Sequence, residues 1–486
     1  MTRILSVFKI LKRVGFAVFV LEGGLAFAQT YVPIWTYEFG ESGSDVVNDL
    51  ISTSDNCVLL AIQSDPDSGE TGRAVLAKLD QDGELLWRQE YREDSMGFVK
   101  AVIEAEDGGY ILVGSGITNW QPQYIVKTDS IGHRQWSRYY NIHPGDWLVD
   151  GVRSTAGGYV LLTRGGSGNS ADATLLWIDS NGNILRNRSY GGSNIDWASE
   201  IAELPDHEYV FALMRSDTSY SRLQPWAGRI DSAGTLIWER FLGTEEDEWV
   251  NTITITENHG SIIAGCRDSH LHEPQVSPFA AAVSPDGDSL WMHIWDDQEG
   301  CIFRCRRVGT DYVLVGNTQS EESGTQSILI IRTSEQGERL CTQVFDTETA
   351  EQAYSLCELS DRAFVVGGWR WNGNSHGWDA FATSFEVNTN VLTDNPVACS
   401  ERFDISIAPN PLNANAVMRI VIPQASHVDV TLYDLLGRVV TDVLSQSFAA
   451  GTFYAQFDAT NISSGIYFVR LHSIRGGVTK KLAIIR

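Results

Sequence analysis

The chain has 486 residues, of which 43% are hydrophobic and 10% aromatic, and its formal net charge is −26. So large an excess of acidic side chains repels phosphate groups, which argues against nucleic acid and anionic membrane surfaces as partners. Forty-four glycines and fifteen tryptophans favour β-structure with many turns over a helical fold.

Residues 1–28 are predicted to be a secretory signal peptide. Three basic residues precede the apolar run 14–20, and residues 26–28 (Ala-Phe-Ala) supply a small-x-small cleavage site. The run is too short to span a membrane, and no other stretch reaches the ~20 apolar residues that a spanning helix needs. We therefore expect a chain without a membrane span once the signal is removed.

A repeat of about 50 residues occupies positions 32–385. A strand-like segment recurs seven times, with intervals of 52, 49, 50, 52, 51 and 52 residues between successive anchors. The anchors are Val58, Tyr110, Tyr159, Tyr209, Ser261, Tyr312 and Phe364. Each unit contains four short strand patterns, which is typical of one propeller blade. The sequence therefore predicts an all-β chain built on a seven-bladed β-propeller.

A turn motif keeps the same period. Asp80-x-x-Gly83 leads to Trp87, Asp129-x-x-Gly132 leads to Trp136, and three more units carry close variants. The Asp or Ser is expected to accept hydrogen bonds from backbone amides of the turn, while the Gly takes a positive φ. We expect the following Trp to pack between neighbouring sheets.

The two ends of the repeat region are predicted to close the ring. Trp35 lies 52 residues before Trp87 and so has the phase of a fourth strand, although no first unit precedes it. The last unit has a third strand at 378–385 and then lacks the Gly and Trp marks. Pairing of residues 32–39 with 378–385 would leave no long unpaired edge.

These units resemble a widespread bacterial repeat of secreted propellers, of the form Tyr-Gly-Gly-Ser…Asp…Asp-Gly-Gly-Tyr-Ile…Gly…Asp…Gly…Trp. Segments 190–193 and 107–111 carry its most recognisable parts. The resemblance covers roughly residues 32–385 and implies an architecture, not a reaction.

Residues 386–402 form a polar linker, and residues 403–486 alternate as a small immunoglobulin-like β-sandwich would. Four motifs follow in order in this second domain: Pro409-Asn410-Pro411, Gly437-Arg438, Gly465-x-Tyr467 and Lys480-Lys481. The domain closely resembles the type A C-terminal sorting domain of the type IX secretion system. This resemblance implies the type IX secretion machinery as a partner and a location outside a Gram-negative-type bacterium, either secreted or on the outer cell surface. An ordinary adhesive sandwich module is the alternative.

Six acidic residues stand thirteen positions before the anchors, where each innermost strand begins. They are Asp45, Asp146, Asp196, Glu248, Glu299 and Glu351. An acid repeated in nearly every unit is interpreted as structural, accepting backbone amides where the chain enters the strand. The alternative is that two of them form the acid pair of a glycosidase.

Loops of unequal length are predicted to emerge on one face of the ring, and variable loops on a rigid scaffold are where recognition occurs. The aromatic residues proposed for binding on this face are Trp120, Trp147, Trp197, Trp249 and Trp371. Seven cysteines at irregular spacing match neither a disulfide framework nor a zinc motif, and they leave one or two disulfides open. No cofactor, metal or catalytic motif is recognised.

The sequence therefore favours a secreted or cell-surface binding or scaffold propeller over an enzyme. Its expected ligand is a polysaccharide or protein partner on the variable-loop face. Two alternatives remain: a carbohydrate-active hydrolase that uses acids at the propeller mouth, and a structural surface component without a discrete ligand.

Overall fold

The structure of the chain is a computed structural model. It describes residues 30–393 and 404–485 except for 41–42, 67–71, 92–95, 117–122, 141, 143–146, 165–171, 192–195, 217–222, 245, 270–274, 320–324, 346–348, 374–376, 389–391, 409–414, 423–425, 436, 449–450, 461 and 474–475. The predicted signal peptide and nearly all of the predicted linker lie outside the described residues.

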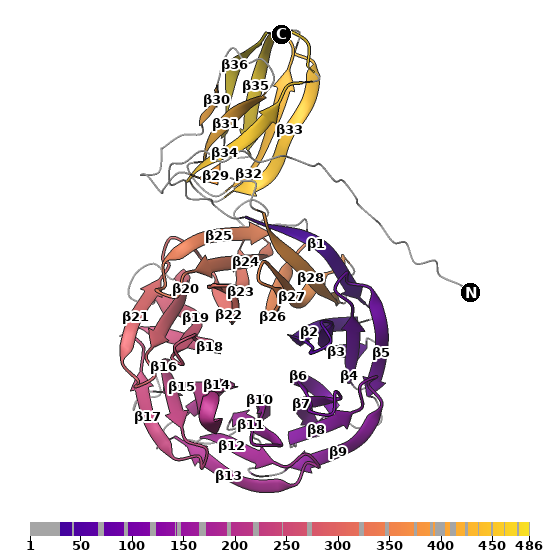
Figure 1. Cartoon of the computed structure of the whole chain (residues 1–486), viewed down its shortest axis with the longest axis vertical. Coiled ribbons are helices and arrows are strands. Elements are labelled where there is room, and N and C mark those ends of the chain that lie inside the picture. The colour runs from indigo at the N-terminus through magenta and orange to yellow at the C-terminus, as the bar shows by residue number, and fades with distance from the viewer. Residues whose placement is uncertain are drawn as a thin grey trace, which may run out of the picture.

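Described residues 30–388 form seven four-stranded antiparallel sheets around a central channel, which is a β-propeller (Figure 1). Numbered first to seventh, and taken from the channel outward, the sheets are β2 (Gly43–Ser52), β3 (Val58–Pro66), β4 (Arg73–Leu79), β5 (Leu85–Tyr91); β6 (Met96–Glu104), β7 (Tyr110–Gly116), β8 (Gln123–Thr128), β9 (Arg134–Tyr140); β10 (Trp147–Arg153), β11 (Tyr159–Arg164), β12 (Ala173–Ile178), β13 (Ile184–Tyr190); β14 (Asp196–Glu203), β15 (Tyr209–Ser216), β16 (Leu223–Ile230), β17 (Leu236–Phe241); β18 (Asp247–Ile255), β19 (Ser261–Ser269), β20 (Gln275–Val283), β21 (Ser289–Ile294); β22 (Cys301–Val308), β23 (Asp311–Gln319), β24 (Gln326–Thr333), β25 (Arg339–Phe345); and β26 (Glu351–Ser360), β27 (Ala363–Trp371), β28 (Trp378–Asn388), β1 (Thr30–Phe39).

The ring closes where the two ends of the repeat region meet. Strand β1 pairs antiparallel with β28, with Trp35 opposite Ser384 and Phe39 opposite Ala380. The predicted pairing of residues 32–39 with 378–385 is confirmed, and the two strands extend slightly beyond those bounds. The seventh sheet thus takes its outermost strand from the start of the propeller and its other three strands from the end.

The turn motif joins each sheet to the one before it. Asp80 Oδ1 accepts hydrogen bonds from the amides of Asp82 and Glu84 at 3.0 and 2.9 Å, and Gly83 has a φ of 81°. A Cβ at Gly83 would lie 2.5 Å from the Trp35 ring of the preceding sheet, so the glycine lets the indole pack against the turn. Trp35 Nε1 also donates to Gln81 O at 2.8 Å. The predicted role of the motif is confirmed.

The third sheet varies this contact. Arg186 occupies the position of the Trp, and its guanidinium stacks on Trp177 of the neighbouring strand at 4.2 Å. Trp177 then packs against the turn glycine of the next sheet, because a Cβ at Gly234 would lie 2.9 Å from the indole. An arginine and a tryptophan on β12 together replace one tryptophan on β13.

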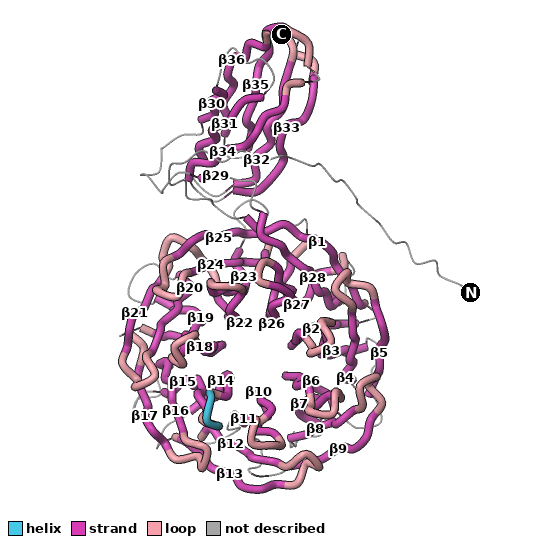
Figure 2. Tube along the Cα trace, in the orientation of Figure 1, coloured by secondary structure: helices cyan, strands magenta, loops and turns pink. Residues whose placement is uncertain are grey.

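Small apolar side chains fill the space between adjacent sheets. Leu60 and Val75 of the first sheet, for example, share a cluster with Val365 of the seventh, and all three are fully buried. Short turns join the inner strands of most sheets (Figure 2), and the 3-10 helix η1 (Pro205–His207) lies at one of them. One disulfide, Cys266–Cys301, links β19 to β22 in the next sheet.

The C-terminal unit consists of two four-stranded sheets. One contains β29 (Leu392–Thr393), β34 (Gly451–Asp458), β31 (Asn415–Ile422) and β30 (Asp404–Ala408). The other contains β33 (Val439–Phe448), β32 (Ser426–Tyr433), β35 (Gly465–Ser473) and β36 (Gly476–Ile484). A buried cluster including Ile405, Met418, Val430 and Leu471 lies between them. No helix within the described part of the chain is long and apolar enough to cross a membrane.

Candidate functional site

The innermost strands line the central channel, and each has a β-bulge at the same place. The residues directly after the bulges are Asp49, Ala101, Asp150, Glu200, Thr252, Arg304 and Ser355. In five of the seven sheets this side chain accepts a hydrogen bond from a backbone amide of the next sheet, at 2.9 to 3.1 Å. A repeated acceptor at this position therefore binds neighbouring sheets to one another around the channel.

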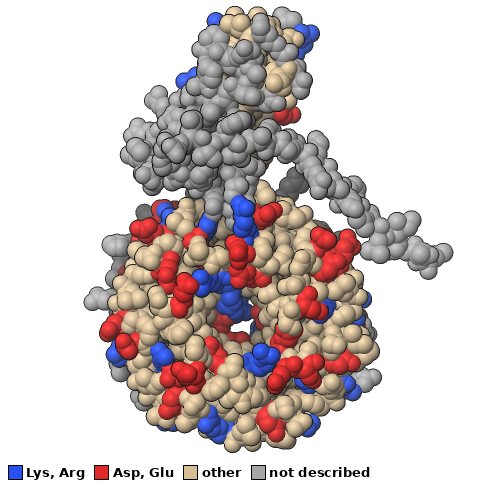
Figure 3. Space-filling view, in the orientation of Figure 1, with Lys and Arg blue, Asp and Glu red and all other residues tan. Residues whose placement is uncertain are grey.

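Arg304 departs from this pattern because it reaches acids on sheets that are not its neighbours. Its Nη2 lies 3.0 Å from Asp49 Oδ1, and its Nη1 lies 2.7 Å from Glu200 Oε1. Arg306 Nη2 approaches the same Glu200 oxygen at 2.6 Å. Only 12% of the Arg304 side chain is exposed, so this contact lies within the protein and links the first, fourth and sixth sheets. In Figure 3 a narrow opening marks the channel, with blue Lys and Arg atoms at its edge.

The channel acids respond differently to this arginine. Burial would raise the pKa of Glu200, but the charges of Arg306 and Arg304 outweigh it and hold that pKa well below its usual value. Burial, together with the charge of Glu200, raises the pKa of Asp150 to about 7. Asp150 also accepts the amide of Ile201 at 2.9 Å, so the carboxylate is needed as an acceptor even where its charge is unfavourable.

Asp150→Asn is expected to stabilise the propeller at pH 8. Because the folded-state pKa lies above the unfolded value near 4, the folded state binds the extra proton between pH 4 and 7. Stability from Asp150 is thus fully present below about pH 4 and is lost as the pH rises to about 7. Asparagine keeps the acceptor oxygen and removes the charge, so we expect a gain of about 2–4 kcal/mol at pH 8.

Urea unfolding at pH 4 to 8 measures this effect. Asp150→Ala serves as the control, because it orphans the Ile201 amide and should be less stable than the asparagine variant at every pH. A parent and an asparagine variant with parallel pH profiles would contradict the assignment.

Aromatic side chains surround one mouth of the channel. Trp147, Trp197 and Trp249 occupy equivalent positions near the starts of β10, β14 and β18. Trp147 is 45% exposed and Trp249 is 50% exposed, whereas Trp197 is half-buried. Phe98, 36% exposed, holds the same position in the second sheet. The structure therefore brings three of the five predicted aromatic residues together.

The other two predicted aromatic residues are not part of this group. Trp371 lies at the end of β27, opposite Trp378 of β28, with 6.4 Å between the ring centroids. Trp120 falls outside the described residues.

The predicted acid ring has members in different settings. Asp196 and Glu351 are buried and form ion pairs with Arg215 and Arg370 of the adjacent strands. Glu248 is buried and accepts the Thr244 amide of its own loop at 3.1 Å, and burial raises its pKa. These contacts are consistent with a structural role, which stays a prediction.

Two more members of the predicted ring are described. Asp45 lies buried in β2. Glu299 is instead exposed in the turn before β22, and Gly300 holds the equivalent place. The prediction was wrong for Glu299, because the hairpin from β22 to β23 is one residue shorter than the others and counting back from Tyr312 overshoots. Asp146 lies outside the described residues.

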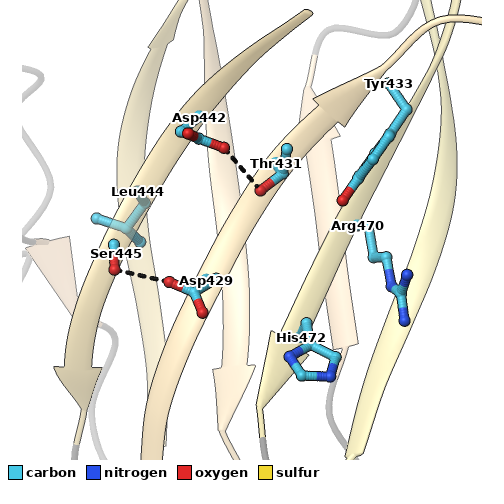
Figure 4. Close-up of a pocket in the computed structure, with 8 residues that line it drawn as sticks. All are labelled: Asp429, Thr431, Tyr433, Asp442, Leu444, Ser445, Arg470 and His472. Carbon is cyan, nitrogen blue, oxygen red and sulfur yellow. Dashed lines mark hydrogen bonds between the residues drawn. The ribbon is translucent and has the colours of Figure 1, made fainter. Parts of the chain in front are cut away.

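A shallow polar pocket lies on the outer face of β33, β32 and β35 in the C-terminal unit (Figure 4). Thr431 donates to Asp442 at 3.1 Å, and Ser445 donates to Asp429 at 2.6 Å. The pocket is also lined by Tyr433, Leu444, Arg470 and His472.

The motif residues of the C-terminal unit that are described occupy turns and strands. Gly437 has a φ of 77° in a turn where the Arg438 amide donates to Asp434 Oδ1 at 2.9 Å. Gly465 begins β35, and Tyr467 is buried with its hydroxyl donating to Ser463 O at 2.9 Å. Lys480 and Lys481 are exposed on β36. Pro409, Asn410 and Pro411 are not among the described residues.

Sequence reasoning missed the acid and arginine cluster of the channel. Nine positions before most anchors there is a side chain with an acceptor oxygen, and a comparison of that column across the repeats would have revealed it. In the described part of the chain, no group of three or more His, Cys, Asp or Glu is placed to hold a metal ion.

Comparisons with known proteins place the C-terminal unit most clearly. Residues 406–485 match the family model of the secretion system C-terminal sorting domain. This domain directs export through the type IX secretion machinery, so the chain is a secreted or cell-surface protein of a Bacteroidetes-type bacterium. No curated protein matches the chain in sequence.

Solved structures resemble the chain in fold. A protein of unknown function from Dyadobacter fermentans has a TM-score of 0.46 at 10% identity, with 74% of this chain and 99% of that one covered. The β-propeller domain of the trilobed protease from Pyrococcus furiosus has a TM-score of 0.42 at 7% identity, with 69% and 95% covered. Prolyl oligopeptidase B from Galerina marginata has a TM-score of 0.40 at 12% identity; 66% of this chain is covered, and the chain spans only 46% of that protein. At these identities the similarity concerns the fold alone.

Proposed function

We propose that the chain is a secreted or cell-surface seven-bladed propeller that binds a polysaccharide or protein partner on its loop face. Its proposed parts are a signal peptide (1–28), the propeller (32–385), a linker (386–402) and an immunoglobulin-like sorting domain (403–486). Export separates the propeller from the cytoplasm, so its partner is a molecule met outside the cell.

The exposed tryptophans at the channel mouth carry the proposal. Trp147 and Trp249 leave about half of their surface in water, although the indole of a folded protein gains from burial. Both rings belong to the innermost strands, at the end where the variable loops begin. A flat aromatic ring held on a rigid strand is a platform for the C–H face of a sugar ring or for an apolar side chain of a partner.

The settings of the acids favour binding over hydrolysis. Among the described members of the acid ring, Asp196 and Glu351 are engaged by arginines and Glu248 by Thr244. A glycosidase needs two carboxyl groups that face one sugar, one of them a proton donor. A carboxylate in an arginine pair is held in its charged form and is a poor proton donor.

Purified wild-type protein is expected to bind at least one member of a panel of extracellular polysaccharides and surface extracts. Trp147→Ala and Trp249→Ala should each weaken that binding, while the melting temperature changes little because both side chains are half exposed. Calorimetry against each panel member measures the first effect, and a thermal melt measures the second. Full binding by a folded double variant would contradict the proposal.

A further inference from the structure

Two cationic side chains near the aromatic mouth have no acidic partner. Within the described part of the chain, no acidic side chain forms an ion pair with Lys100 of β6 or with Arg164 of β11. In a chain with a net charge of −26, most buried or half-buried arginines of the propeller are paired, as Arg215 is with Asp196 and Arg370 with Glu351. An unpaired pair of cations therefore needs another explanation.

Strand geometry places both cations beside the tryptophans. Lys100 is the bulge residue of β6, exposed between the buried Val99 and Ala101 of a channel-lining strand. Arg164 is the β11 residue directly opposite Trp147, and its guanidinium stacks on the Trp197 ring at 4.0 Å. A stacked guanidinium is held in place while its edge stays available to accept an anion.

The electrostatic state of the two groups agrees with an empty anion site. Burial by the channel wall lowers the pKa of Lys100, and the charge of Arg164 lowers it further. Burial also lowers the pKa of Arg164. Both shifts mean that the cationic forms are under-solvated and repel each other, so a bound anion would stabilise both.

We infer that Lys100, Arg164, Trp147 and Trp197 form a binding site for an anionic sugar unit of an acidic polysaccharide. The cations bind its carboxylate or sulfate, and the exposed Trp147 ring stacks on the sugar. This inference rests on the proposed function and specifies its ligand class. The net negative charge of the protein weakens long-range attraction of a polyanion, so affinity comes from these local contacts.

Binding of the purified full chain to polysaccharides tests the inference. The probes are polygalacturonate for carboxylate, dextran sulfate for sulfate, and unmodified dextran as the neutral polymer. We expect the wild type to bind one of the anionic polymers more tightly than dextran. Lys100→Gln and Arg164→Gln should each weaken that binding about tenfold or more, since each removes a charge-assisted hydrogen bond. The matched control is Arg240→Gln, on the outer strand β17, which should bind like the wild type.

The outcomes separate the two claims. Tighter binding of dextran than of either polyanion overturns the inference and leaves the proposed function standing. Polyanion binding that Lys100→Gln and Arg164→Gln do not change, in variants that melt like the parent, also overturns it. Failure to bind any polysaccharide or surface extract overturns the proposed function and the inference together.

Discussion

Deletion of strand β1 (residues 30–39) from the exported chain is expected to abolish cooperative unfolding of the propeller. The deletion exposes the edge of β28 and removes Trp35 from the first-sheet turn. It also removes the contacts of the buried Tyr31, whose amide donates to Gln343 Oε1 at 2.7 Å and whose ring packs on Phe364 at 4.7 Å. Losing several large buried side chains, at about 3–5 kcal/mol each, exceeds the usual stability of a domain.

Two point variants provide the matched comparison. Trp35→Ala and Trp238→Ala each remove an indole that donates to a turn carbonyl of the next sheet at 2.8 Å, and neither opens the ring. Each should lose about 3–5 kcal/mol and still unfold in one transition. Denaturant unfolding followed by tryptophan fluorescence and by circular dichroism distinguishes them from the deletion. A deletion variant with one sharp, coincident transition near that of the parent would show that closure does not stabilise the ring.

Ring closure could be predicted from sequence because its signal is local and repeated. Trp35 keeps the spacing of a fourth-strand tryptophan, so its phase alone assigned it to a sheet whose other strands lie some 350 residues away. The turn motif was equally legible, since an Asp and a Gly three residues apart determine their own backbone geometry. Periodic marks of this kind survive without any knowledge of tertiary contacts.

The channel cluster was invisible for the opposite reason. Asp49 and Arg304 are 255 residues apart, and neither stands in a motif that announces a partner. Only the closed ring brings the sixth sheet opposite the first and fourth. The misplacement of Glu299 has a related cause, because counting from an anchor assumes equal hairpins and one short hairpin shifts the register.

Lys100 and Arg164 were also beyond sequence reasoning. The repeat gives them no distinctive position: the residues equivalent to Arg164 in the neighbouring sheets are Ser115 and Met214. Their significance comes from what the fold leaves out, an acidic partner, and from what it adds, the Trp197 ring of the next sheet. A single sequence shows which residues repeat, whereas a site is made by the residues that depart from the repeat.

Replacement of Arg304 by methionine is expected to destabilise the propeller by about 3–5 kcal/mol at pH 8. The change keeps an unbranched apolar stem but leaves Asp49 and part of the charge of Glu200 buried without their cation. Asp49 retains only the hydroxyl of Ser355, which donates at 2.9 Å, and the amide of Val102 at 3.0 Å. Neutral donors compensate a buried charge less well than a guanidinium does.

The pH dependence of the loss identifies its cause. Without Arg304, the folded-state pKa values of Asp49 and Glu200 rise, so protonation at low pH removes the unpaired charges. The difference in unfolding free energy between parent and variant should then shrink between pH 8 and pH 5. Arg306→Met provides the control, because Arg306 contacts only Glu200 of these acids and is more exposed, so its loss should be smaller. Adding Asp49→Asn to Arg304→Met should recover part of the stability, since it removes one buried charge and keeps an acceptor for Val102. An equal loss at both pH values, with no recovery in the double variant, would mean that Arg304 contributes packing rather than charge to the channel.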